Sequence, residues 1–484
     1  MRLARAIRDR LPEGSFIKNV LTLMTGTVFA QALLVLLAPL LTRLYDPEAF
    51  GVFSLYTSIV GFLAVIACLR YERAIVLPEK DEDAANLLGL SMLICLGIAV
   101  SSLVFVALWG KDIAKLLDAP ALTFWFWFLP LSIIGAGGFI AFNYWSTRRK
   151  QFKRLAFRQV TYSSVMLFTQ IGAGFLWHSG AGGLISGNII GQVAATARLA
   201  WQIFRDEGRE ILSSISRQSM GKMLGRYRRF PLYDTWSGLL NTAAAMLPAL
   251  LLAFFFNPVI VGFYALGQRV LALPMGVIGS AVAQAFFPRA TEARRAGELD
   301  RVTREMFSGL LDFGVVPIIL VAIVAPELFS LIFGKEWYVA GEYVRWLSMW
   351  CLFQFISSPI SAVYLVLERQ RALLGFNIAL LSMGLSALVI GGIHGNALLT
   401  IKLFGLSGVI MYIYFSVKIM MMSGNSFRNT IKVLAEAVFK AIPYIVPLLI
   451  YMAFVGDPIV STVIAIVTGI VFVFIKAKTL VRQN

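Results

Sequence analysis

The sequence predicts an all-α membrane protein with about fourteen transmembrane helices. Of its 484 residues, 58% are hydrophobic and only 14% are charged, against about 25% charged in an ordinary soluble domain. The apolar residues fall into long unbroken runs, and a helix needs about 20 such residues to cross a bilayer. These runs exclude a soluble enzyme with one packed core. They also exclude a transmembrane β-barrel, because its strands alternate in hydrophobicity.

Fourteen candidate spans follow from a scan of hydropathy along the chain. They lie near residues 17–41, 50–70, 86–108, 121–144, 156–177, 181–204, 232–256, 259–287, 307–333, 341–366, 372–392, 397–422, 434–455 and 458–478. Twelve spans would be the next count to consider.

The basic residues give an independent check on this order of spans. Loops on the side of the N-terminus hold 36 Lys or Arg, those on the other side and the adjoining helix ends hold 6, and Arg269 is left inside the eighth span. Because positively charged loops stay in the cytoplasm, both termini are expected there. The net charge of +17 is explained in this way, and no nucleic-acid partner is expected.

An internal repeat divides the chain. The segment DPEAFGVFSLY (46–56) recurs as NPVIVGFYALG (257–267), at a constant offset of 211 residues. In each copy an Asx-Pro pair starts a tight turn, and Gly51 or Gly262 lets the following helix pack closely. Two copies in the same orientation predict two six-helix lobes in parallel repeat, with two further helices at the C-terminus.

The predicted domains follow from this repeat. They are an N-terminal lobe of six spans, a basic cytoplasmic linker, a C-terminal lobe of six spans, and the last two spans; their bounds are 1–204, 205–230, 231–422 and 423–484.

The sequence contains none of the nucleotide-binding or hydrolase motifs that would indicate an enzyme, and no metal-type spacing of cysteines. We therefore predict a transporter with no metal and no cofactor, and leave coupling to a proton or sodium gradient open. Arg269 is the most informative residue, because an arginine at the middle of a bilayer costs about 2.5–3.5 kcal/mol on insertion scales. Such a residue must face water, a carboxylate or an anionic ligand. The alternatives for Arg269 are a substrate phosphate and an ion pair with Asp234 or Asp312, and these two aspartates are also candidates for coupling.

Three further arginines are candidates for loading an anionic substrate at the cytoplasmic side. Arg70 and Arg73 lie at the end of the second span, and Arg148 lies at the end of the fourth. Their alternative is the ordinary positive charge of cytoplasmic loops. The first span carries no carboxylate, which disfavours exchange of a cationic drug, whereas a basic cavity suits phosphate.

Three segments resemble the Wzx-type oligosaccharide flippases of the MOP (multidrug/oligosaccharidyl-lipid/polysaccharide) superfamily. They are LTRLYDPEAFGVFSLY (41–56), RYERAIVLPEKDEDAANL (70–87) and GFYALGQRVLALPMGVIGSAVAQAFFPR (262–289). The resemblance covers the first twelve spans and implies a two-lobed bundle of MATE/MOP type. Its implied function is the flipping, by alternating access, of undecaprenyl-pyrophosphate-linked oligosaccharide across a bacterial inner membrane, in surface polysaccharide or O-antigen (lipopolysaccharide) biosynthesis.

The resemblance also suggests partners and alternatives. The partners are the lipid-linked oligosaccharide, the bilayer and a complex with a polysaccharide polymerase or glycosyltransferase. In the related lipid II flippases, arginines on the first, second and eighth spans line the cavity, and here Arg269 matches plainly. The first span has no arginine before Arg43, and Arg70 lies at the end of the second span. Flipping of lipid II, cation-coupled drug export and a membrane scaffold without transport stay as alternatives.

Overall fold

The fold is known from a computed structural model of the chain, which describes residues 16–177, 180–274 and 279–483. Within these ranges every regular element is a helix, as predicted. The predicted cytoplasmic segment before residue 16 lies outside the described residues.

Eleven helices of the described part are long and apolar enough to cross a membrane. The described residues of the three other predicted spans are helical as well. They correspond to α8 (Phe152–Trp177), α9 (Ala181–Ser214) and the pair α12 (Pro258–Pro274) and α13 (Ser280–Ala296). Helices α8 and α9 carry polar residues such as Gln170 and Gln192, and the apolar part of α12 is short. The eleven spans and these three others agree with the prediction of about fourteen membrane-spanning helices.

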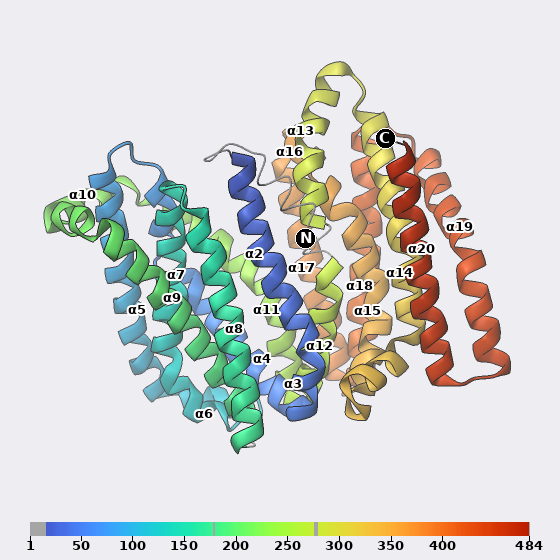
Figure 1. The fold of residues 1–484 in the computed structure, drawn as a ribbon, viewed down its shortest axis with the longest axis horizontal. Helices are drawn as coiled ribbons and strands as arrows, with labels where there is room; N and C mark the ends of the chain where they lie inside the picture. The colour runs from blue at the N-terminus through green and yellow to red at the C-terminus, as the bar shows by residue number, and fades with distance from the viewer. Residues whose placement is uncertain (1–15, 178–179, 275–278, 484) are drawn as a thin grey trace. The chain divides into compact units, whose positions relative to one another are not determined.

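The chain forms two compact units, residues 1–261 and 262–484, with the boundary inside α12. Figure 1 draws the first unit from blue to green. Its helices are α8, α9, α2 (Phe16–Leu36), α3 (Ala38–Leu44), α4 (Pro47–Ile66), η1 (Tyr71–Val76), α5 (Asp81–Leu116), α6 (Leu122–Trp125), η2 (Phe126–Phe128), α7 (Leu129–Arg148), α10 (Arg217–Arg226), η3 (Phe230–Asp234) and α11 (Thr235–Phe255). Those of the second unit, after α13, are α14 (Leu299–Phe333), η5 (Lys335–Trp337), α15 (Tyr338–Ile360), α16 (Ala362–Val366), α17 (Gln370–Ile393), α18 (Ala397–Met422), α19 (Phe427–Phe454) and α20 (Pro458–Gln483). Helix α11, the first of the predicted C-terminal lobe, packs along α4 in the first unit, and the lobe bounds 1–204 and 231–422 stay a prediction.

Both copies of the sequence repeat form the predicted helix start. The Asp46 side chain accepts a hydrogen bond from the amide of Ala49 at 2.7 Å, and Asn257 accepts one from Ile260 at 3.2 Å. These bonds satisfy amide groups that have no partner within their own helix. A Cβ on Gly51 would lie 1.7 Å from the carbonyl oxygen of Pro258, so only glycine allows this approach of α4 to the second copy.

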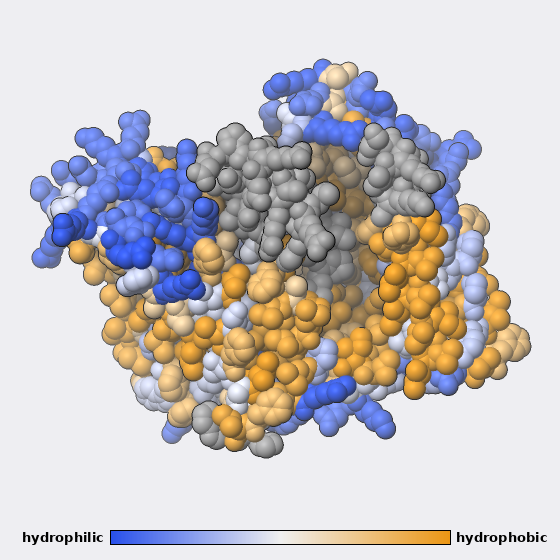
Figure 2. Space-filling view, in the orientation of Figure 1, coloured by the Kyte–Doolittle hydropathy of each residue, from blue (hydrophilic) through white to orange (hydrophobic). Residues whose placement is uncertain are grey.

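The predicted linker 205–230 is mostly helical. Helix α9 continues to Ser214, and α10 packs against α5. Asn86 on α5 fixes the turn between α9 and α10, because its side chain donates to the carbonyl of Ser214 at 2.8 Å and accepts from the amide of Ser216 at 2.9 Å. Figure 2 shows hydrophilic residues gathered over α10 and the adjoining ends of α5 and α9.

Candidate functional site

A strained turn after α4 brings two predicted site residues to η3, just before α11. Leu69 and Arg70 have φ angles of 48° and 64°, in the left-handed region that residues with a side chain rarely adopt. Arg73 Nη1 lies 3.2 Å from Asp234 Oδ1, and Arg70 Nε lies 3.9 Å from Asp234 Oδ2. Arg70, Arg73 and Asp234 are thus brought together. The ion pair of Asp234 with Arg269 stays a prediction.

This cluster also contains a buried acid. Glu72 is 2% exposed, and its Oε2 is buried without a hydrogen-bond partner in the described part of the chain. Burial raises the pKa of the Glu72 carboxyl above its ordinary value, and the guanidinium groups of Arg70 and Arg73 offset part of that rise. Two arginines therefore face two carboxyl groups, so the cluster carries little net charge when Glu72 is ionised.

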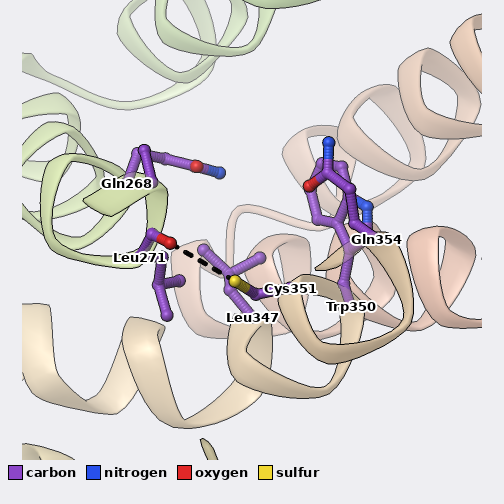
Figure 3. Close-up of a pocket in the computed structure, with 7 residues that line it drawn as sticks. Gln268, Leu271, Leu347, Trp350, Cys351 and Gln354 are labelled. Carbon is purple, nitrogen blue, oxygen red and sulfur yellow. Dashed lines mark hydrogen bonds between the residues drawn. The ribbon is translucent and has the colours of Figure 1, made fainter. Parts of the chain in front are cut away.

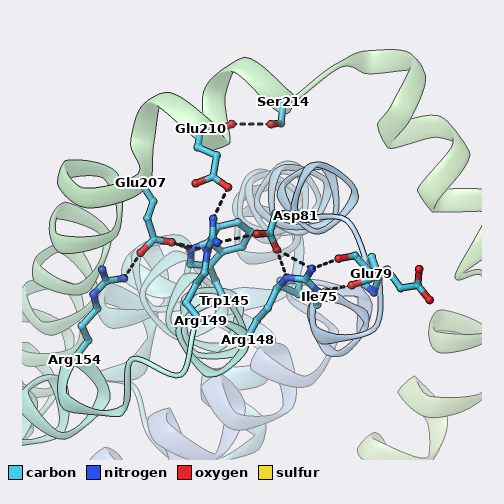
Figure 4. Close-up of polar contacts among 11 residues, drawn as sticks. Ile75, Glu79, Asp81, Trp145, Arg148, Arg149, Arg154, Glu207, Glu210 and Ser214 are labelled. Carbon is cyan, nitrogen blue, oxygen red and sulfur yellow. Dashed lines mark hydrogen bonds and ion pairs between the residues drawn. The ribbon is translucent and has the colours of Figure 1, made fainter. Parts of the chain in front are cut away.

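Arg148, the last residue of α7, contacts the connection between η1 and α5 through its side chain (Figure 4). Its Nε donates to Asp81 Oδ1 at 2.9 Å, its Nη1 donates to the carbonyls of Ile75 and Pro78 at 3.3 and 2.5 Å, and its Nη2 donates to that of Glu79 at 3.2 Å. Arg148 Nη2 also lies 2.8 Å from Asp81 Oδ1. A guanidinium has five N–H donors, and four of them make these hydrogen bonds. Arg148 therefore fixes the backbone beside the Arg70–Asp234 cluster, and its contact with a phosphate stays a prediction.

A larger ion-pair network next to Arg148 was missed by the sequence analysis. Arg149 contacts Asp81 at 2.7 Å, Glu207 at 3.1 Å and Glu210 at 2.5 Å, and Arg154 contacts Glu207 at 2.7 Å. The network ties α5, α7, α8 and the extended end of α9 together (Figure 4). The acids at positions 206, 207 and 210 would share one side of a helix that continued beyond residue 204, which is the signal that could have revealed it.

Asp312 forms an ion pair in the second unit. Its two carboxylate oxygens lie 3.4 Å from Lys440 Nζ and 3.3 Å from Lys476 Nζ. The aspartate is on α14, and the lysines are on α19 and α20. Asp312 thus contacts lysines of the last two helices, and its predicted pair with Arg269 stays a prediction.

Arg269 lies on α12 in the second unit and is half-buried. A cavity of about 170 Å³ lies on the same helix, between α12 and α15 (Figure 3). The described residues that line it are Gln268, Leu271, Ala272, Leu347, Trp350, Cys351 and Gln354. Their spacing of three, four and seven residues places them on the facing sides of two helices. The lining is mainly apolar, with two amides as its polar groups and no charged side chain among the described lining residues.

A second hollow of the same unit is apolar. It has a volume of about 550 Å³, lies between α14 and α20, and is lined by Pro317, Leu320, Val321, Val324, Leu328, Ala465, Ile466, Gly469, Ile470, Val473 and Phe474. Figure 2 shows apolar residues along α20. A surface of this composition favours a hydrocarbon chain over a polar ligand.

Comparisons with known proteins identify the sequence family and the fold. A family model described as polysaccharide biosynthesis protein matches residues 40–342, more than half of the chain. Among solved structures, the chain is similar to the lipid II flippase MurJ in an inward closed conformation, with a TM-score of 0.68 and 14% identity over 95% of this chain and 99% of that one. No curated protein matches by sequence.

Two transporters have the same fold. An inward-facing multidrug resistance MATE family transporter of the MOP superfamily gives a TM-score of 0.57 with 14% identity, over 88% of this chain and 99% of that one. The Vibrio cholerae MATE transporter VcmN gives 0.55 with 17% identity, over 87% and 97%. The predicted MATE/MOP type of fold is thereby confirmed.

Proposed function

Because the chain belongs to the polysaccharide biosynthesis protein family, we propose that it flips a polyprenyl-pyrophosphate-linked oligosaccharide from the cytoplasmic to the outer leaflet of a bacterial inner membrane. Undecaprenyl pyrophosphate is the carrier that we propose, and surface polysaccharide or O-antigen biosynthesis is the process. The protein moves this substrate without changing its bonds.

The observation that supports the proposal most is that the second unit has both a cavity with amide groups and an apolar groove, and carries Arg269 on α12. A lipid-linked oligosaccharide combines three chemistries, namely a hydrocarbon chain, a doubly charged diphosphate and hydroxyl-rich sugars. The second unit offers an apolar groove between α14 and α20 and a cavity between α12 and α15 whose lining includes two glutamine amides. Arg269 lies on the same helix α12. Arginine suits the diphosphate, because its planar guanidinium donates two parallel hydrogen bonds to phosphate oxygens.

Arg70 and Arg73 have a loading role in this proposal. Their shared partner Asp234 is a carboxylate, and a diphosphate offers the same arginines more acceptor oxygens and more charge. Arg73 is 41% exposed at its side chain, so an incoming headgroup can reach it. Exchange of Asp234 for the diphosphate would favour entry without holding the cargo permanently. Both termini are placed in the cytoplasm on the charge pattern alone.

The experiment uses purified full-length protein in proteoliposomes, with a fluorescent lipid-linked oligosaccharide and an impermeant quencher. We expect Arg269→Ala to slow flipping by about tenfold or more, because a hydrogen bond to a charged group contributes about 1.5–3 kcal/mol. Arg269→Lys should retain part of the rate, since the charge survives and the two-pronged geometry does not. Arg371→Ala, an exposed arginine at the start of α17, is the matched control.

Two results would decide against the proposal. Full activity of Arg269→Ala would remove this residue from the substrate site. Movement of a cationic dye, with no movement of the lipid-linked oligosaccharide, would instead favour the multidrug exporter. In cells, depletion of the protein should leave the lipid-linked oligosaccharide facing the cytoplasm.

A further inference from the structure

We propose that Gly238 on α11 is a positioning residue of the loading site formed by Arg70, Arg73 and Asp234. Because it has no side chain, it lets the Arg70 guanidinium lie against the helix backbone, near Asp234 but outside hydrogen-bond distance of it. This inference rests on the proposed function, in which a diphosphate takes the place of the Asp234 carboxylate.

The contact between Gly238 and Arg70 leaves no room for a side chain on α11. A Cβ on Gly238 would lie 1.8 Å from Arg70 Nη2, 2.7 Å from Cζ and 2.9 Å from Nε. Heavy atoms that are not bonded to each other normally lie about 3.5 Å apart or more. Any residue other than glycine at this position would therefore displace the guanidinium.

The Arg70 side chain is confined at both of its ends. The turn that carries it holds Leu69 and Arg70 at φ angles of 48° and 64°, and the amide of Arg73 donates to the carbonyl of Arg70 at 3.1 Å. Only 12% of the Arg70 side chain is exposed. The turn therefore sets where the side chain begins, and the α11 backbone at Gly238 sets where the guanidinium lies.

This position makes the pair of Arg70 and Asp234 a loose one. Arg70 Nε lies 3.9 Å from Asp234 Oδ2, which is too far for a hydrogen bond, and both atoms are buried without a hydrogen-bond partner in the described part of the chain. Arg73 differs, because its Nη1 donates to Asp234 Oδ1 at 3.2 Å. Exchange of the carboxylate for a diphosphate therefore breaks a hydrogen bond at Arg73 but none at Arg70 Nε.

Packing between helices is the alternative role for Gly238. The three atoms nearest to its added Cβ all belong to the Arg70 guanidinium, whereas those nearest to an added Cβ on Gly51 all belong to the backbone of Pro258. The end of an arginine side chain can move by rotation, but backbone cannot move without shifting a helix. An alanine at position 238 should therefore shift the guanidinium and leave α4 and α11 in place.

The shift is large on the scale of a hydrogen bond. Moving Arg70 Nη2 to about 3.5 Å from the new Cβ displaces it by about 1.7 Å, whereas hydrogen-bond lengths vary by only about 0.5 Å. A guanidinium that moves toward Asp234 forms the missing hydrogen bond and holds the carboxylate more tightly. One that moves away takes its charge out of the site. Both displacements weaken exchange for a diphosphate.

The test measures the dissociation constant of undecaprenyl diphosphate for full-length protein in lipid nanodiscs. We expect Gly238→Ala to weaken binding by about tenfold, the value of one hydrogen bond to a charged group. Its melting temperature should be no lower than that of the wild type, since alanine favours a helix over glycine. Gly97→Ala is the matched control, because an added Cβ on Gly97 would meet no other atom within 4 Å, and it should bind as the wild type does.

A double variant decides whether Gly238 acts through Arg70. Arg70→Ala should also weaken binding, and Gly238→Ala should then add no further loss, because no guanidinium is left to displace. A further loss in the double variant, unchanged binding by either single variant, or a lowered melting temperature of Gly238→Ala would each overturn the positioning role, while the flippase stands. If the wild-type protein does not bind undecaprenyl diphosphate, the proposed function itself fails.

Discussion

Replacement of Gly51 by alanine should force apart the start of α4 and the start of α12. The new Cβ would lie 1.7 Å from the carbonyl oxygen of Pro258, 2.5 Å from its carbonyl carbon and 3.0 Å from its Cα. All three atoms belong to the backbone, so no side-chain rotation can relieve the contact. A close carbon–oxygen contact lies at about 3.3 Å, and the two segments must therefore separate by about 1.6 Å.

The energetic effect follows from two opposing terms. Overpacking costs about 1–3 kcal/mol in a well-packed core, and the upper end applies because backbone has to move. Alanine is better than glycine in a helix by about 1 kcal/mol, which offsets part of the cost. We expect Gly51→Ala to lower the free energy of unfolding by about 2 kcal/mol.

The assay is the apparent melting temperature of the detergent-solubilised protein, followed by fluorescence-detected size-exclusion chromatography. Gly97→Ala is the matched control, because Gly97 lies on α5 where an added Cβ would meet no other atom within 4 Å. This control should only gain helix propensity, about 1 kcal/mol. A melting temperature of Gly51→Ala equal to that of the wild type would refute the close approach of the two repeat copies.

Two other variants test the cluster near the α4–α5 connection. Arg148→Lys should lower stability by about 2 kcal/mol, because the single ammonium group of lysine cannot reproduce the four hydrogen bonds that the planar guanidinium makes. An unchanged melting temperature would contradict this, and Arg371→Lys is the exposed control. The pKa of Glu72 is raised by burial, so the folded protein holds that proton more tightly than the unfolded chain. The resulting stability is complete below the ordinary glutamate pKa and is lost as pH rises through the raised value. As pH rises through the raised pKa of Glu72, the melting temperature of the wild type should therefore fall relative to that of Glu72→Gln. A difference between the two melting temperatures that does not change with pH would contradict this prediction.

The sequence by itself determined the features that depend on neighbouring residues. Apolar runs of membrane-crossing length predicted the helices, because a helix satisfies its own backbone hydrogen bonds in lipid whatever its neighbours are. The Asx-Pro pairs at 46–47 and 257–258 predicted two helix starts, because the capping bond joins residues three apart. The family followed from motifs in consecutive residues.

Only the tertiary structure decided which distant side chains meet. The partner of Arg73 is Asp234, 161 residues away, and that of Lys476 is Asp312, 164 residues away. The cavity joins Gln268 to Gln354 across two helices. Hydropathy records how apolar each helix is, but not which face it turns to which neighbour, since packing of whole helices fixes their rotation. For this reason the sequence indicated Arg148 only as one of the basic residues on the cytoplasmic side. Its contacts with Asp81 and with three backbone carbonyls depend on the folded chain.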